Sequence, residues 1–559
     1  MTESHSKYTP FKPIAMPKRK WPSNILTKAP QWCSVDMRDG NQALIHPMDI
    51  PKKLDYFKML VDIGVKEIEV GFPSASETEF NTIRTLIEDG YIPDDVTIQV
   101  IVQAREDLIK RTFESLRGAK KAILNFYNSV STLQRKVVFN TDVEGVKRIA
   151  TDAAKTILDL SYPLISSGTD LRFEYTAESF SGAETDSAIE ICQAVLETMG
   201  ATPENKIILN LPSTVEISMP NHYADQIEYF IDNLPSRESA IVSIHTHNDR
   251  GTGVAATELA LLAGAERAEC TLFGNGERTG NTDILTLAMN MYSQGIDHGL
   301  DFSNIDRIRE TYEKCTGLDV PARHPYAGEL AFTAFSGSHQ DAINKGMRYM
   351  QQHGSTSWEV PYLPIDPADI GRKYDQIIRV NSQSGKAGPA YIMNHYYGFD
   401  IPKPIQKDFA RIVQAQGDTS GNELSHEEIY SLFKDEYINL EYPYRMIKHS
   451  FAESTDTTGH SHVSFSGTLA HKNTIFEVSG EGNGPIDAFF NAIKGQKMAA
   501  HQFIDYKEHS ISDGSDSMAV AYIHLRSNDG VDEFGVGISH NINVAPLRGI
   551  ISAINRSKR

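Results

Sequence analysis

Short β-branched runs alternate with longer amphipathic stretches between about residue 31 and residue 293. This alternation is typical of strand–helix–strand units that build a parallel sheet. We expect strands at residues 33–36, 67–71, 96–102, 122–126, 171–176, 206–211, 240–245 and 267–273. The intervening helices are expected at residues 52–63, 77–88, 106–116, 142–159, 186–198, 221–233, 253–263 and 283–292.

Eight strand–helix pairs within roughly 250 residues match the size of a (β/α)₈ barrel. The alternative is an open doubly wound sheet, but no G-x-G-x-x-G turn follows the first strand to support a dinucleotide site in it. We therefore predict an α/β fold in which a TIM-barrel catalytic domain occupies residues 31–328.

The segments outside the predicted barrel have different patterns. Residues 1–30 contain five prolines and a Lys18-Arg19-Lys20 run, which favours an extended arm over a helix. Residues 329–441 mix short helices with prolines but are rich in Tyr, Phe and Ile, so we expect two small folded linker subdomains. Strand alternation begins near residue 442, where two stretches are weak copies of one unit and predict an α+β domain over 442–559.

Composition and charge narrow the choice of partners. The 559 residues are 40% hydrophobic and 23% charged, without an apolar run of membrane-spanning length, and a multidomain soluble protein is expected. The net charge of −19 repels nucleic acid and anionic lipid, which favours small-molecule partners. The four cysteines lie far apart with no C-x-x-C pair, so they are expected to be reduced and buried, as in a cytoplasmic protein.

Four polar clusters follow apolar strands of the predicted barrel. They lie at residues 34–42, 177–180, 245–249 and 274–281. The reactive groups of TIM-barrel enzymes lie at the carboxyl ends of the strands, so these clusters are expected to meet at one mouth of the barrel. Taken alone, the pair Arg38 and Asp39 is as consistent with a structural salt bridge as with a catalytic site. The recurrence of the pattern favours the catalytic interpretation.

His245 and His247 are two residues apart at a strand end, so their rings point to the same face and can meet one ion. A lone histidine is more often a core residue, but Asp39 and Asn281 follow strands one and eight, which adjoin in a closed barrel. Two imidazoles, a carboxylate and an amide oxygen suggest an octahedral divalent ion. This ligand set does not choose among Mg²⁺, Mn²⁺ and Zn²⁺.

These motifs resemble a known family. Residues 36–42, 69–73, 245–249 and 274–281 are similar to those of the metal-dependent acyl-CoA Claisen condensation and lyase superfamily. Residues 210–216, 338–342 and 380–386 resemble, within that superfamily, the 2-isopropylmalate synthases. The resemblance covers nearly the whole chain.

The resemblance implies a reaction and roles for named residues. A 2-isopropylmalate synthase condenses acetyl-CoA with 3-methyl-2-oxobutanoate, and water then releases 2-isopropylmalate and CoA, at a divalent ion for which we expect Mg²⁺. Arg38 would stabilise the alkoxide. The catalytic proton transfers would be shared by three residues, Glu178, His339 and Tyr362. The remaining matched positions, which would bind the oxo acid, are Asn125, Thr176 and Thr214.

Asn125 departs from the family pattern, in which a histidine contacting the oxo acid is expected at this position. Asparagine keeps a donor and an acceptor but lacks the titratable proton. His339 and Tyr362 lie beyond the barrel, so they would reach its site from the linker region of the same or a partner subunit.

The C-terminal region resembles a regulatory domain that binds leucine as a feedback inhibitor, in a protein expected to be a homodimer. Gly482, Asn483 and Gly484 form a turn before a predicted helix, where backbone N–H groups can hold a small anion or simply pack closely. A lyase and a catalytically silent amino-acid sensor are the rival interpretations. The C-terminal repeat argues against a lyase and the complete ligand set against a sensor, whereas homocitrate and citramalate synthases share the metal motif.

Overall fold

The computed structural model describes two compact units. The described residues are 7–9, 11, 13–334, 336–354, 356–372, 374, 387–420, 424–455, 461–495, 498, 500–511 and 517–559. Unit 1 comprises Met1–Phe332 and Ile365–Tyr374, and unit 2 comprises Thr333–Pro364 and Asp375–Arg559. Residues 380–386, one of the motifs that carry the family resemblance, lie outside the described residues.

Unit 1 contains a closed barrel of eight parallel strands paired in sequence order, with β1 closing on β8. The strands are β1 (Gln31–Ser34), β2 (Glu67–Gly71), β3 (Thr97–Gln103), β4 (Lys121–Ser129), β5 (Asp170–Glu178), β6 (Ile207–Asn210), β7 (Ala240–His245) and β8 (Arg267–Cys270). Because β1 and β8 pair, the polar residues that follow them are neighbours despite lying more than 200 residues apart. The predicted TIM barrel is therefore confirmed.

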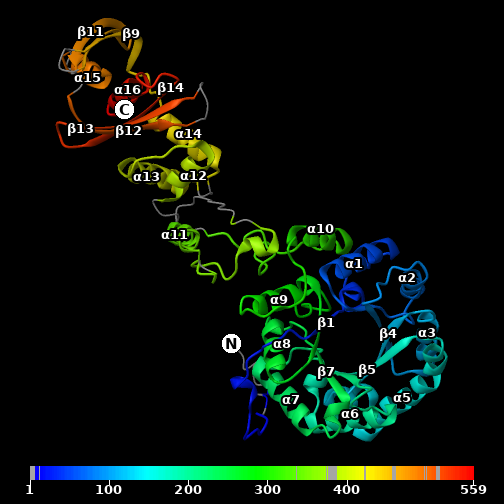
Figure 1. Ribbon diagram of the computed structural model, residues 1–559. Coiled ribbons are helices and arrows are strands. Elements are labelled where there is room, and N and C mark those ends of the chain that lie inside the picture. The colour runs from blue at the N-terminus through cyan, green and yellow to red at the C-terminus, as the bar shows by residue number, and fades with distance from the viewer. Residues whose placement is uncertain are drawn as a thin grey trace. The chain divides into compact units, whose positions relative to one another are not determined.

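Helices surround the ring of strands (Figure 1). They are α1 (Ile50–Ile63), α2 (Glu77–Glu88), α3 (Glu106–Ser115), α4 (Thr132–Gln134), α5 (Val143–Ser166), α6 (Thr185–Met199), α7 (Pro220–Asn233), α8 (Gly253–Leu262), α9 (Ile284–Tyr292) and α10 (Ile305–Thr316). Side-chain caps define several starts, for example Asp49 accepting from Lys52 N and Ser76 accepting from Glu79 N.

Several predicted boundaries were wrong, among them both ends of β1 and the end of β4. Two other errors have identifiable reasons. Helix α5 continues past the expected end at Asp159, through Pro163, because Ile157 and Leu164 extend its buried face. Strand β8 ends at Cys270 rather than Phe273, because Leu272–Gly274 form a 3₁₀ turn in which Phe273 has a φ of 55°. This turn releases the chain from the sheet ahead of the loop that carries Asn281.

The N-terminal arm is anchored to the barrel rather than free along its described length. Arg19 makes a two-point salt bridge to Asp225 of α7, and the indole N–H of Trp21 donates to the same carboxylate. The backbone N–H groups of Lys20 and Trp21 donate to Glu228. The arm therefore has fixed partners, and it is not extended throughout, because Trp21–Ser23 form a 3₁₀ turn.

Unit 2 begins with helices and continues into two sheets. The helices are α11 (Gly337–His353), α12 (Ala387–Tyr397), α13 (Lys403–Ser420) and α14 (His426–Tyr437). The first sheet contains β9 (Tyr444–Thr455), β10 (Ser461–His471) and β11 (Thr474–Gly482), followed by α15 (Pro485–Gly495). The second contains β12 (His501–Ser510), β13 (Ala519–Ser527) and β14 (Asp532–Ser539), followed by α16 (Ala545–Arg556).

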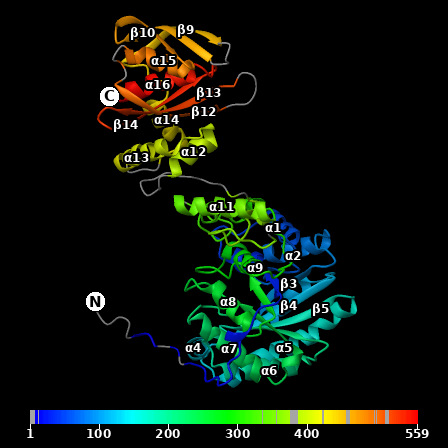
Figure 2. The same cartoon turned by 60° about the vertical axis from the view of Figure 1, so that its left-hand side comes forward.

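The two sheets thus repeat one strand–strand–strand–helix unit, as the weak sequence repeat predicted. Figure 2 shows α15 and α16 between the sheets, where Phe465, Phe489 and Ile554 contribute to a common core. A second core joins α12–α14 to strands β13 and β14, including Phe433, Tyr522 and Val536. The linker helices and the second repeat therefore stabilise each other.

Two further expectations can be compared with the described residues. Cys33, Cys192, Cys270 and Cys315 are all free thiols and buried, as expected. No helix in the described part of the chain is long and apolar enough to cross a membrane.

Candidate metal centre and its cavity

The turn after β1 presents Arg38 and Asp39 from a single π-helical turn, Asp36–Gly40. The backbone N–H groups of Arg38, Asp39 and Gly40 all donate to the carbonyl of Val35, at 3.2, 2.9 and 3.2 Å. Gly40 is confined by the β8–α9 loop, whose Asn275 side chain donates to its carbonyl at 3.0 Å. The turn is therefore fixed against the loop that carries Asn281.

The predicted metal ligands converge. The Nε2 atoms of His245 and His247 each lie 3.6 Å from Oδ2 of Asp39, and their rings are stacked with centroids 5.1 Å apart. Asn281 donates to Asp39 Oδ2 at 2.8 Å, and its Oδ1 lies 2.8 Å from His245 Nε2. One ligand atom from each of Asp39, His245 and His247 lies within 4.8 Å of the others.

This arrangement fits a divalent ion. Ligands at right angles around an ion at ~2.1 Å are ~3 Å apart, close to the 3.6 Å between each imidazole Nε2 and the carboxylate of Asp39. The Nδ1 of His247 is buried without a hydrogen-bond partner among the described residues. The donor set combines nitrogen and oxygen, so it accepts Mg²⁺, Mn²⁺ and Zn²⁺ alike.

Electrostatics also prepare the cluster for a cation. Burial would raise the pKa of Asp39, but the guanidinium of Arg38, 2.7 Å away, holds that pKa well below its usual range. Burial opposes a charge on His245, yet the neighbouring carboxylates of Asp39 and Glu269 raise its pKa to about 10. Burial and the neighbouring His245 lower the pKa of His247 to about 3. At neutral pH His245 therefore carries a proton, whereas His247 is neutral and Asp39 is ionised.

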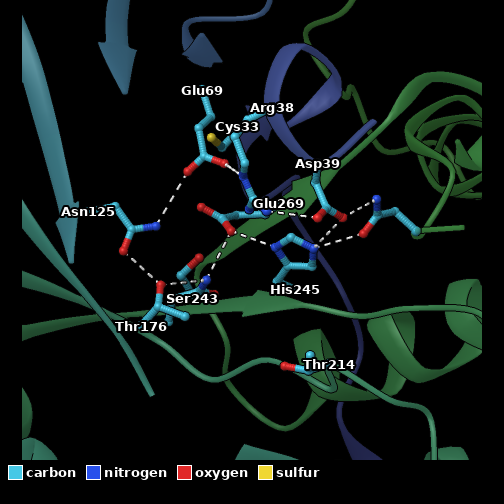
Figure 3. Close-up of polar contacts among 12 residues, drawn as sticks. Cys33, Arg38, Asp39, Glu69, Asn125, Thr176, Thr214, Ser243, His245 and Glu269 are labelled. Atoms are coloured by element: carbon cyan, nitrogen blue, oxygen red, sulfur yellow. Dashed lines mark hydrogen bonds and ion pairs between the residues drawn. The ribbon is translucent and has the colours of Figure 1, made fainter. Parts of the chain in front are cut away.

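Arg38 is held from its other side by Glu69 of β2. Its Nε donates to Oε1 of Glu69, whose side chain is fully buried, while its Nη1 donates to Asp39. Figure 3 shows Arg38 between these two carboxylates, with His245 and Glu269 beside them. Opposed carboxylates fix the guanidinium plane, so its orientation is set before any substrate arrives.

These residues face a cavity of about 660 Å³ at the carboxyl end of the barrel. Its wall contains most of the predicted site residues: Arg38, Asp39, Asn125, Thr176, Glu178, Thr214, His245 and His247. Asn281 lies behind this wall and reaches the cluster through Asp39 and His245. The lining adds Tyr127, which the sequence did not single out. It also adds Asn210, Glu277 and Arg278, which lie in the motifs 210–216 and 274–281 but were given no role.

Asn125 is part of a hydrogen-bond chain rather than an isolated wall residue. The hydroxyl of Thr176 donates to Asn125 Oδ1 at 2.8 Å, and Asn125 Nδ2 donates to Glu69 at 3.4 Å. Thr214 accepts from the backbone N–H of Ser179 at 2.9 Å, next to Glu178. Thr176, Asn125 and Thr214 therefore have fixed orientations at the cavity wall (Figure 3).

His339 and Tyr362 belong to unit 2. Their rings stack at a centroid distance of 4.0 Å, and the side chain of Tyr362 is 60% exposed with a backbone φ of 65°. His339 is exposed as well. The structure brings these two predicted residues to each other.

The Gly482–Gly484 turn joins β11 to α15. A Cβ on Gly482 would approach the backbone N of Ala488 to 2.4 Å, so this glycine permits close packing of strand on helix. The N–H of Asn483 already donates to Asp487 at 3.1 Å, whereas a Cβ on Gly484 would meet nothing within 4 Å. The packing interpretation accounts for Gly482, and Gly484 is the open position of the turn.

Sequence reasoning missed a buried polar layer beneath the metal cluster. It comprises Glu67, Glu69, Gln99, Glu174, Arg267 and Glu269. The available signal was charged or amide residues at alternate positions of otherwise apolar strands, as at Glu67 and Glu69 or Arg267 and Glu269. Alternate positions share a face, so these side chains point into the barrel together.

Comparisons with known proteins agree with this geometry. Residues 29–311 match the HMGL-like family, residues 329–394 the alpha-isopropylmalate synthase post-catalytic domain, and residues 423–558 the LeuA allosteric (dimerisation) domain. The 2-isopropylmalate synthase of Pseudomonas putida strain W619 is 52% identical over 100% of this chain and 98% of its own length. That of Clostridium acetobutylicum is 51% identical over 99% of each chain. The chain belongs to the 2-isopropylmalate synthase family.

Membership of the 2-isopropylmalate synthase family confirms that the protein is an acyltransferase with a catalytic TIM barrel and a LeuA domain. Among solved structures, the hydroxymethylglutaryl-CoA lyase of Pseudomonas aeruginosa aligns with 55% of this chain and 98% of its own, at 16% identity and a TM-score of 0.44. A role of this family member in leucine biosynthesis under allosteric control follows from the full-length relatives and the LeuA domain.

Proposed function

We propose that this protein condenses acetyl-CoA with 3-methyl-2-oxobutanoate and, with water, releases 2-isopropylmalate and CoA. The observation that carries the proposal is the convergence of Asp39, His245, His247 and Asn281 beside Arg38 at one cavity. The relatives' name gives the product, and the cavity supplies a place for a small 2-oxo acid next to a cation site.

Asp39, His245, His247 and Asn281 would hold the ion, for which Mg²⁺ is our assignment and Mn²⁺ and Zn²⁺ are the alternatives. Bound there, the ion supplies a Lewis acid for the keto group and a template for the oxo acid. Asn125, Thr176 and Thr214 line the cavity and orient the oxo acid by hydrogen bonds.

Carbon–carbon bond formation requires a proton to leave the methyl group of acetyl-CoA. We assign this transfer to Glu178 at the cavity wall together with His339 and Tyr362 of unit 2. As the new bond forms, the keto oxygen becomes an alkoxide, and the fixed guanidinium of Arg38 stabilises that charge. Water then hydrolyses the thioester, so CoA leaves as a thiol and the product carries a second carboxylate.

We further propose that leucine, the end product, binds the LeuA domain with Gly482, Asn483 and Gly484 at its site, and that the protein is a homodimer. The match of residues 423–558 to an allosteric dimerisation domain supports both assignments. The repeated α+β units give this domain its own core, distinct from the barrel.

The direct test is thiol release from acetyl-CoA with a panel of 2-oxo acids, with and without EDTA. We expect 3-methyl-2-oxobutanoate to give the highest kcat/KM, and EDTA to stop the reaction until Mg²⁺ or Mn²⁺ is restored. A preference for pyruvate or 2-oxoglutarate would assign a citramalate or homocitrate synthase instead. Cleavage of 2-isopropylmalate without detectable condensation would indicate a lyase.

A further inference from the structure

The buried layer beneath the metal cluster has one residue that joins both halves of the site. Gln99, on β3, is fully buried and does not line the cavity. Its Nε2 donates to Glu69 Oε2 at 2.8 Å and to Glu269 Oε1 at 2.9 Å. Its Oε1 accepts from Nη2 of Arg267 at 2.7 Å. Both N–H groups of the amide and its oxygen thus bond to charged side chains.

The orientation of this amide follows from its partners. A guanidinium only donates and a carboxylate only accepts, so the oxygen must face Arg267 and the NH₂ group must face Glu69 and Glu269. No other uncharged side chain of this size offers two donors and one acceptor in this geometry. A glutamate at position 99 would set a third carboxylate against the other two.

Each carboxylate held by Gln99 supports one part of the reactive site. Glu269 Oε2 lies 2.8 Å from Nδ1 of His245, which leaves Nε2 of that ring for the ion. Glu69 Oε1 accepts from Nε of Arg38, the group assigned to the alkoxide. Figure 3 shows Glu69 next to Arg38 and Glu269 next to His245. Among the described residues, Gln99 is thus the one side chain that hydrogen-bonds directly to both carboxylates. A separate route links Arg38 to His245 through Asp39 and Asn281.

We propose that Gln99 is a positioning residue that couples the alkoxide-stabilising arginine to the metal-binding histidine. Its amide holds the carboxylates of Glu69 and Glu269 in fixed positions relative to each other. This inference rests on the proposed function, since it assumes a metal at His245. Residues that orient a metal ligand typically contribute 10–100-fold to metal affinity when they are changed. Gln99 does not contact the metal ligand itself, but it donates to both Glu69 and Glu269, the carboxylates that orient Arg38 and His245.

The test uses the full-length protein with two substitutions. Gln99→Met keeps the side-chain length and removes every hydrogen bond, whereas Gln99→Glu keeps the acceptor for Arg267 and removes the shared donor. Mn²⁺ binding to the purified protein is measured by electron paramagnetic resonance, kcat is measured at saturating Mn²⁺, and thermal unfolding is followed in parallel. The matched control is Ser243→Ala, because Ser243 is equally buried and accepts from Arg267 at 2.9 Å but makes no hydrogen bond to Glu69 or Glu269 within the described part of the chain.

We expect both Gln99 variants to bind Mn²⁺ about tenfold or more weakly and to lose about tenfold or more of kcat at saturating Mn²⁺. Ser243→Ala should lower the melting temperature with less than twofold change in Mn²⁺ affinity. Glu269→Gln should weaken Mn²⁺ binding, and adding Gln99→Met to it should cost less than the product of the single effects, because both act through one carboxylate.

Mn²⁺ affinity and saturated kcat within twofold of wild type in either folded Gln99 variant would overturn the inference. Equal losses in Ser243→Ala would overturn it as well, because they would reflect general damage to the buried layer. Wild-type protein that binds no Mn²⁺ would remove the metal site and the proposed function together with the inference. The Mn²⁺ titration of the wild-type protein therefore distinguishes failure of this inference from failure of the proposed function.

Discussion

The metal cluster of unit 1 and the His339–Tyr362 pair of unit 2 are built in opposite ways. Asp39, His245 and Asn281 are nearly fully buried and tied to one another and to a polar layer beneath them. His339 and Tyr362 are exposed and stack face to face. The ion-binding groups are thus preorganised by the barrel, whereas two of the three groups assigned to proton transfer, His339 and Tyr362, belong to unit 2.

This difference predicts that substitutions in the two regions will have different effects on ion binding and on turnover. Changes in the barrel cluster should remove ion binding and catalysis together. Changes in unit 2 should leave ion binding intact and act on turnover or on its control. The following predictions test this separation, beginning with the largest effect.

Replacing His247 by alanine should abolish condensation and Mn²⁺ binding, because the remaining ligands cannot compensate for a lost imidazole at a buried site. Thiol release and Mn²⁺ titration measure the two losses. His222→Ala is the control, since His222 contacts Phe11 of the N-terminal arm and not the cluster. Near-normal turnover and metal content in His247→Ala would refute the ligand assignment.

Replacing His339 by alanine should lower kcat by ~10²–10⁴-fold, the usual contribution of a general acid or base. Mn²⁺ affinity and the KM for the oxo acid should change little, because proton abstraction belongs to the transition state. His353→Ala, on the same helix α11, should retain activity. An unchanged kcat with a raised KM would make His339 a binding residue.

The leucine response should be separable from catalysis through Gly484. A side chain there meets no atom within 4 Å, so Gly484→Val should fold normally while it obstructs the start of α15. We expect uninhibited kcat to stay within twofold of wild type and the leucine concentration for half inhibition to rise by ~5–150-fold, the range of typical couplings. Leucine inhibition curves are measured for Gly484→Val and for the control Asn543→Ala, which lies in the corresponding turn before α16. If the two variants gave the same inhibition curve, leucine would bind elsewhere.

The smallest effect concerns pH and stability. Burial raises the pKa of Asp36 from its ordinary 3.8 to about 7, despite hydrogen bonds from Tyr56, Ser34 and Leu272 N–H. The folded state then holds a proton that the unfolded state releases between pH 4 and pH 7, so stability falls with rising pH across this window.

Asp36→Asn removes this titration. Relative to wild type, the variant's free energy of unfolding should improve between pH 4 and pH 7 by an amount on the order of 4 kcal/mol, and should not improve further above pH 7. Urea unfolding followed by tryptophan fluorescence at several pH values measures this difference. A constant difference across the window would contradict the raised pKa.

Local patterns in the sequence predict much of the barrel. Each strand is a short apolar run, and β2, β7 and α2 begin and end at the predicted residues. The convergence of Asp39, His245 and Asn281 could also be predicted, from the H-x-H spacing and the closure of β1 on β8.

The parts that the sequence did not predict depend on contacts between distant strands. Gln99 meets Glu269 across 170 residues, and neither residue belongs to a recognisable motif. Strands β9 and β12 were not predicted individually, because both are largely exposed and lack a continuous apolar face. The roles of His339 and Tyr362 came from family resemblance alone, since nothing in their local sequence indicates catalysis.

The central claim is that the barrel cluster binds the ion beside the oxo acid. Crystals grown with Mn²⁺ and 3-methyl-2-oxobutanoate, with diffraction data collected at the manganese absorption edge, test it directly. The account predicts one anomalous peak per chain enclosed by Asp39, His245 and His247, with the oxo acid in the same cavity and Arg38 at its keto end. An oxo acid bound in the cavity with no manganese among these three residues would contradict it.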